Sequence, residues 1–78
     1  MLVIKCKILE VLFPNYKNNK TYNKTVNYLK SIIDGCELDD KLSHLSVFMN
    51  KYYNLVDVIS LLAAYDLYEY YELMKNEK

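Results

Sequence analysis

The scarcity of helix-breaking residues is the strongest constraint on how this chain can fold. Its 78 residues include one proline, Pro14, and one glycine, Gly35, while 53% are hydrophobic and 26% are charged. Proline and glycine are the residues that most disfavour helix interiors, so helices can form on either side of each. A chain of this length supports one modest hydrophobic core. We therefore expect a single small domain, residues 1–78, that is mainly α-helical.

Apolar side chains recur at helical spacing from Thr21 onward. The first stripe consists of Tyr22, Val26, Leu29 and Ile33, and the second of Leu38, Leu42, Leu45, Met49 and Tyr52. Thr21 can cap the first helix, and Gly35 can end it in a left-handed conformation. Asp39 and Asp40 suit the first turn of the second helix, where negative charge is favoured. These patterns predict two amphipathic helices joined at Gly35.

A third helix is predicted after Asn54, which can act as a cap with Asp57 three residues later. The segment 55–65 is apolar nearly all round, which is typical of a helix at the centre of a core. The tail from Tyr68 to Met74 keeps helical spacing. It either extends the third helix or forms a fourth helix after a bend near Asp66 and Leu67.

The N-terminal segment, residues 2–13, is predicted to form a β-strand. Ile4, Cys6 and Ile8 alternate with Lys5 and Lys7, which is the period of a half-buried strand. The denser apolar run 8–13 also suits a buried turn of helix. The predicted fold is thus a small three- to four-helix domain with a short N-terminal β-strand.

Composition limits the compartment and the classes of partner. All ten basic residues are lysine, and the absence of arginine disfavours phosphate readout by a guanidinium fork. Abundant Lys, Asn, Tyr and Ile is typical of an AT-rich genome, such as those of several large DNA viruses. Two cysteines are too few for a disulfide framework, and no segment has the length of a transmembrane helix. We expect an intracellular protein without a membrane anchor.

The side chains that carry catalysis or metal binding are sparse. His44 is the only histidine, and neither Cys6 nor Cys36 belongs to a closely spaced metal-binding pair. Asp39 and Asp40 are adjacent, so a helix would separate them by about 100° and they could not act on one substrate. The sequence therefore predicts no catalytic residue, no metal and no cofactor. An enzyme would need a second chain to complete a site around His44 or Cys36.

Lysines and tyrosines interleave between residues 16 and 30. This segment contains Lys17, Lys20, Lys24 and Lys30 together with three tyrosines, and it has no acidic residue. Single-stranded nucleic-acid binders combine cations and aromatic rings in this way. The alternative function is therefore a small viral accessory protein that binds nucleic acid through residues 16–30, with these four lysines as the contacts. Zero net charge favours a protein partner instead.

Four tyrosines cluster near the C-terminal end. Tyr65, Tyr68 and Tyr71 are spaced by three residues along one helical face, and Tyr70 lies beside them. Tyrosine suits protein interfaces because its ring can be dry while its hydroxyl stays wet. Packing at the edge of the core is the other interpretation. We expect a non-enzymatic interaction module that uses this face, or the edge of the N-terminal strand, to bind another protein or a second copy of itself.

Two segments together resemble part of a known family. The first is Val11-Leu12-Phe13-Pro14-Asn15 with the helix that ends Val26-Asn27-Tyr28-Leu29-Lys30, and the second is the leucine-rich run from Asn54 to Leu67 with its Ala63-Ala64 pair. They are similar to the later half of BTB/POZ and Skp-type adaptor domains. The resemblance implies a strand end at residues 11–15 and an adaptor that docks a partner helix or a cullin-like scaffold. Ser60 departs from the pattern, which expects a buried aliphatic residue there.

Overall fold

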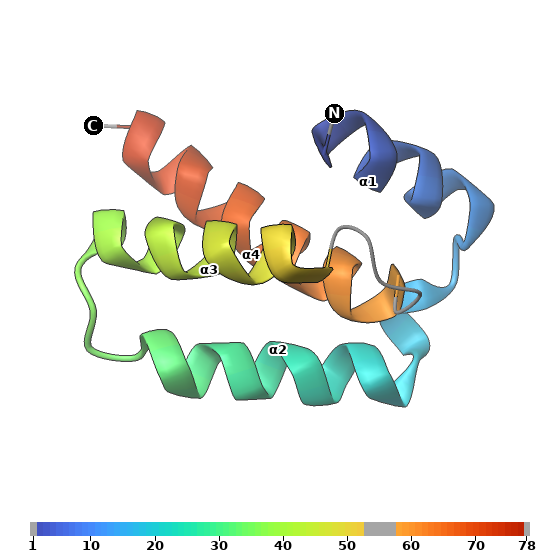
Figure 1. Cartoon of the computed structure of the whole chain (residues 1–78), viewed down its shortest axis with the longest axis horizontal. Helices are drawn as coiled ribbons and strands as arrows, with labels where there is room; N and C mark the ends of the chain where they lie inside the picture. Colours follow the sequence, from blue (N-terminus) through green and yellow to red (C-terminus); the bar gives the residue numbers. More distant parts are fainter. Residues whose placement is uncertain (1, 53–57, 78) are drawn as a thin grey trace.

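The computed structural model describes residues 2–52 and 58–77, and this part of the chain is almost entirely helical. Its elements are α1 (Leu2–Leu12), the 3-10 helix η1 (Tyr16–Asn18), α2 (Lys20–Ile33), α3 (Leu38–Tyr52) and α4 (Val58–Asn76). Figure 1 shows α2 and α3 side by side, with α4 crossing behind α3 and α1 above the start of α4. The prediction of a mainly α-helical domain is confirmed.

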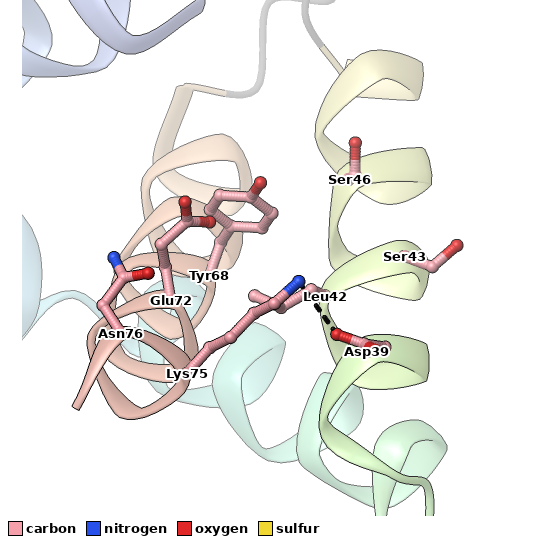
Figure 2. Close-up of a pocket in the computed structure, with 8 residues that line it drawn as sticks. All are labelled: Asp39, Leu42, Ser43, Ser46, Tyr68, Glu72, Lys75 and Asn76. Carbon is pink, nitrogen blue, oxygen red and sulfur yellow. Dashed lines mark ion pairs between the residues drawn. The ribbon is translucent and has the colours of Figure 1, made fainter. Parts of the chain in front are cut away.

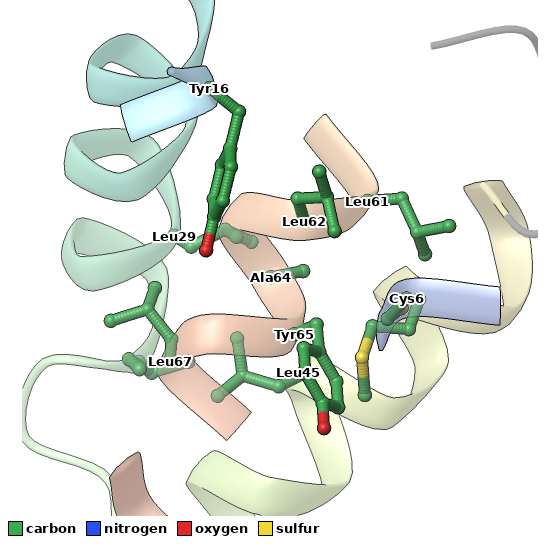
Figure 3. Packing of buried hydrophobic residues seen from close by; sticks show 11 residues of the cluster. Cys6, Tyr16, Leu29, Leu45, Leu61, Leu62, Ala64, Tyr65 and Leu67 are labelled. Atoms are coloured by element: carbon green, nitrogen blue, oxygen red, sulfur yellow. The ribbon is translucent and has the colours of Figure 1, made fainter. Parts of the chain in front are cut away.

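Helix α4 is the centre of the fold because it contacts α1, η1, α2 and α3. Its buried side chains are Ser60, Leu61, Leu62, Ala63, Ala64, Tyr65 and Leu67. Figure 3 shows Leu61, Leu62, Ala64, Tyr65 and Leu67 of α4 packed together with Leu29 from α2, Leu45 from α3 and Cys6 from α1. Ala63 and Ala64 have small side chains, which lets the neighbouring helices approach α4 closely. The central position predicted for this segment is therefore confirmed within the described residues.

The predicted N-terminal strand is wrong. Residues 2–12 form α1, and no strand occurs in residues 2–52 or 58–77. Cys6 and Leu9 are three positions apart and both pack on the core, which is the spacing of one helical face. The alternation of Ile4, Cys6 and Ile8 suggested a strand because this helix carries apolar side chains on two opposite sides. The strand end implied at residues 11–15 is likewise replaced by the end of α1 and a turn.

The ends of the helices agree in part with the sequence. Gly35 has a φ of +80°, so the predicted left-handed stop after α2 is confirmed. Asn19, and not Thr21, caps α2, and its side chain accepts a hydrogen bond from the backbone N–H of Thr21 over 2.8 Å. Helix α4 runs unbroken from Val58 to Asn76, so the C-terminal tail extends the third predicted helix. The predicted cap at Asn54 lies outside the described residues.

Candidate interaction surface

The inner side of α1 holds this helix on the core. Cys6 is completely buried and belongs to the central cluster, and Leu9 packs against that cluster. Burial, followed by the negative charge of Glu10, raises the pKa of the Cys6 thiol to about 11. The thiol is therefore protonated at neutral pH and is a poor nucleophile. Cys6 therefore contributes to the packing of α1 on the core.

The outer side of α1 is also apolar, but it is exposed. Four side chains, each between 54% and 79% exposed, form what we call the α1 outer stripe: Ile4, Ile8, Val11 and Leu12. They line an open hollow together with Lys7. Ile4, Ile8 and Val11 are separated by four and three residues, which is the spacing of the contact seam in paired helices. A helix that is apolar on both sides is normally covered on both sides.

A tyrosine and carboxylate cluster secures the segment that follows α1. Tyr22 donates a hydrogen bond to Asp66 Oδ2 over 2.7 Å. The Tyr16 hydroxyl lies 3.0 Å from Asp66 Oδ2 and 3.2 Å from Glu10 Oε1, and the Tyr16 and Tyr22 rings meet edge to face. Burial and these carboxylates raise the pKa of both tyrosines, so both hydroxyls remain donors at neutral pH. The cluster joins α1, η1, α2 and α4 on the side of α1 away from its outer stripe.

The structure divides the four tyrosines predicted to form an interface. Tyr65 is buried in the core, where its hydroxyl donates to Glu69 over 2.9 Å. Tyr68 and Tyr71 are half-buried, and Lys41 of α3 lies 5.0 Å from the centre of the Tyr71 ring. Tyr70 is exposed and meets Tyr71 edge to face. Of the four tyrosines, Tyr70 therefore has the largest exposed fraction available to a partner.

Two further apolar side chains are exposed beside Tyr70. Leu73 and Met74 lie three and four residues beyond it on α4, so the three share one side of the helix. We call Tyr70, Leu73 and Met74, which are between 42% and 58% exposed, the α4 end stripe. Sequence reasoning identified Tyr70 and missed Leu73, although its helical spacing from Tyr70 is visible in the sequence.

The four lysines of the alternative function are exposed along η1 and α2. Lys17, Lys20, Lys24 and Lys30 all reach solvent, and the Lys17 ammonium lies 5.9 Å from the Tyr16 ring centre. The tyrosines between these lysines do not form an exposed row of rings. Tyr16 and Tyr22 turn inward to Asp66, and only Tyr28 of the three is exposed. Stacking platforms for bases need several exposed rings. The arrangement therefore gives little support to nucleic-acid binding.

A further hollow lies between α3 and α4. It has a volume of about 430 Å³ and is lined by Asp39, Leu42, Ser43, Ser46, Tyr68, Glu72, Lys75 and Asn76. Figure 2 shows Lys75 reaching across its mouth to Asp39, with an N–O distance of 3.0 Å. This pair satisfies both charges on the surface. The lining contains two serines, but it contains no histidine that could act as their base and no cysteine that could act as a nucleophile.

Other chemistry is sparse in the described residues. His44 lies on the exposed side of α3, and no three His, Cys, Asp or Glu side chains in residues 2–52 and 58–77 gather as metal ligands. None of the helices in the same ranges combines the length and apolar character needed to cross a bilayer. The predictions that the chain is not an enzyme and binds no metal or cofactor stay predictions.

Comparisons with known protein families, with curated proteins and with solved structures found no match. The resemblance to BTB/POZ and Skp-type adaptors therefore stays a prediction. Of the two segments that suggested it, residues 58–67 are helical as the resemblance implies, whereas residues 11–15 lack the implied strand.

Proposed function

We propose that this chain is a non-enzymatic protein-interaction module whose docking surface is the α1 outer stripe. The observation that carries the proposal is the exposure of Ile4, Ile8, Val11 and Leu12 on a helix whose other side already packs on the core. Adaptors and assembly subunits expose contiguous apolar surface of this kind because a partner covers it.

The free energy available from covering this stripe supports a specific complex. Full burial of one aliphatic side chain stabilises by about 1.5 to 3 kcal/mol. Each of the four side chains keeps more than half of its surface exposed, so covering them supplies several kcal/mol before the costs of association. Helix α1 is anchored to the fold on its inner side, because Cys6 is buried and the Asp66 cluster holds the next segment. Little ordering of α1 is then needed on binding.

Site-specific photo-crosslinking tests this proposal with a matched pair of positions. Val11 lies in the stripe, and Val47 is a 67% exposed valine on α3 outside it. We expect p-benzoylphenylalanine at position 11 to give protein adducts in the cells that naturally express the chain. The same group at position 47 should give none. Adducts with lipid alone, or no adducts from position 11, would contradict a protein-docking role.

A further inference from the structure

We infer that the partner covering the α1 outer stripe is a second copy of this chain, which docks its α4 end stripe there. The inference rests on the proposed function and specifies the occupant of the same surface. Three features of the molecule support it: two apolar stripes, opposite charges near them, and the location of their two helices on one side of the fold.

The two stripes match in chemical character. The α1 outer stripe presents Ile4, Ile8 and Val11 at steps of four and three, and the α4 end stripe presents Tyr70, Leu73 and Met74 at steps of three and one. Both patterns follow a single side of a helix, so the two helices can pack stripe against stripe. Each stripe exposes apolar surface to water, and each would cover the other.

The charges around the stripes are opposite. Helix α1 carries Lys5 and Lys7, and its only acid, Glu10, lies near the Tyr16 hydroxyl on the inner side. Near the α4 end stripe lie Glu69, which accepts the hydrogen bond of Tyr65, and Glu77, one residue beyond α4, whereas Glu72 lines the hollow between α3 and α4. The lysine of α4 within the described residues, Lys75, forms an ion pair with Asp39 of α3. An α1 helix docked on another α1 would bring lysines together, whereas α1 docked on α4 brings lysines to carboxylates.

The location of the two helices allows the contact to form twice. Figure 1 shows α1 and the last turns of α4 on the same side of the molecule, away from α2. Two copies related by a two-fold axis can then exchange contacts, with each α1 on the other copy's α4 end. A closed pair of this kind covers both stripes of both copies. We therefore expect a dimer and not an open chain of molecules.

Complementary substitutions test the pairing. Ile8→Glu places a charge in the α1 outer stripe, and Leu73→Lys places the opposite charge in the α4 end stripe. Both positions are more than half exposed, so each variant should fold. Light scattering over a dilution series should give twice the 9.3 kDa chain mass for the wild type. Each variant alone should weaken dimerisation by about tenfold or more, because both of its contacts contain the substitution.

A mixture of the two variants is the decisive sample. In the mixed dimer, one contact pairs the introduced carboxylate at position 8 with the introduced ammonium at position 73, and the other contact has the natural residues. The mixed dimer should therefore form at concentrations where each variant alone is monomeric. Val47→Glu serves as the control and should leave the dimer unchanged. Far-UV circular dichroism should show equal helix content in all samples.

Three results would overturn the inference. A wild type that stays at 9.3 kDa at every concentration excludes the second copy. A dimer that survives Leu73→Lys but not Ile8→Glu indicates that two α1 helices pair with each other. A mixture that stays monomeric excludes the α1 and α4 pairing. If the wild type is monomeric while position 11 still crosslinks to another protein, the self-docking fails and the proposed function stands.

Discussion

Asp66 is a residue on which two polar contacts between distant segments converge. It accepts hydrogen bonds from Tyr22, 44 positions away, and from Tyr16, 50 positions away. Hydrogen bonds to a charged group contribute about 1.5 to 3 kcal/mol each when removal leaves a buried partner unsatisfied. We expect Asp66→Ala to lower the free energy of unfolding by about 2 kcal/mol, because Asp66 is only half-buried. Urea unfolding measures this change.

Asp39→Ala is the matched control for that substitution. Asp39 has a close partner too, the ammonium group of Lys75, but both side chains are more than half exposed. An exposed ion pair of this kind contributes little to stability. The free energy of unfolding should therefore fall far less in Asp39→Ala than in Asp66→Ala. Equal losses from the two substitutions would mean that the Asp66 cluster has no special role in stability.

Glu10 should make stability depend on pH in the acidic range. Burial, and then the negative charge of Asp66, raise the Glu10 pKa above its ordinary value of 4.5. The folded state thus binds this proton more tightly than the unfolded state. The stability that protonation provides is complete below pH 4.5 and is lost as the pH rises through the folded-state pKa.

Glu10→Gln isolates this contribution, because glutamine keeps the shape of the protonated acid. We expect the variant to be more stable than the wild type at pH 7, by less than about 1 kcal/mol since the carboxyl group stays in contact with water. The difference should vanish below pH 4.5. Urea unfolding at both pH values checks it, and a variant less stable at pH 7 would contradict the assigned repulsion.

At the scale of elements, the sequence predicts α2 and α3 well and α1 badly. Local signals decide the first two: the stripe of α2, the left-handed Gly35 and the acids at the start of α3 all lie within a few residues of what they determine. The type of α1 depends on its packing against α4, more than 45 residues later. Its two-sided apolar character resembles strand alternation, and the outer stripe cannot be identified until the helix is recognised.

Cys6 can report whether α1 stays docked. Its thiol is buried with a pKa of about 11, whereas Cys36 is partly exposed. In a Cys36→Ser variant, a thiol-reactive disulfide reagent should modify Cys6 far more slowly than it modifies the unfolded chain. Adding Leu9→Ala, which removes packing between α1 and the core, should speed the modification. A rate equal to that of the unfolded chain would show that α1 does not protect Cys6.

At the scale of the whole molecule, the core cluster formed by the described residues is small, so there is little stability to lose. A chain of 78 residues typically has a free energy of unfolding of about 4 to 12 kcal/mol. Leu62 is fully buried on α4, and removing such a side chain costs about 2 to 5 kcal/mol. We expect Leu62→Ala to lose a large part of the free energy of unfolding and to unfold at a much lower temperature than the wild type. Val47→Ala, at an exposed position, should melt close to the wild type, as thermal circular dichroism can show.

The central position of α4 also has a consequence for synthesis. Helix α1 leaves the ribosome before α4, which follows more than 45 residues later. Translation at about 5 to 20 residues per second separates the two by seconds. During that time both apolar sides of α1 are in water, because the helix that buries Cys6 and Leu9 has not yet been made. The nascent chain should therefore be a client for chaperones that recognise short apolar segments, until α4 arrives and only the outer stripe remains.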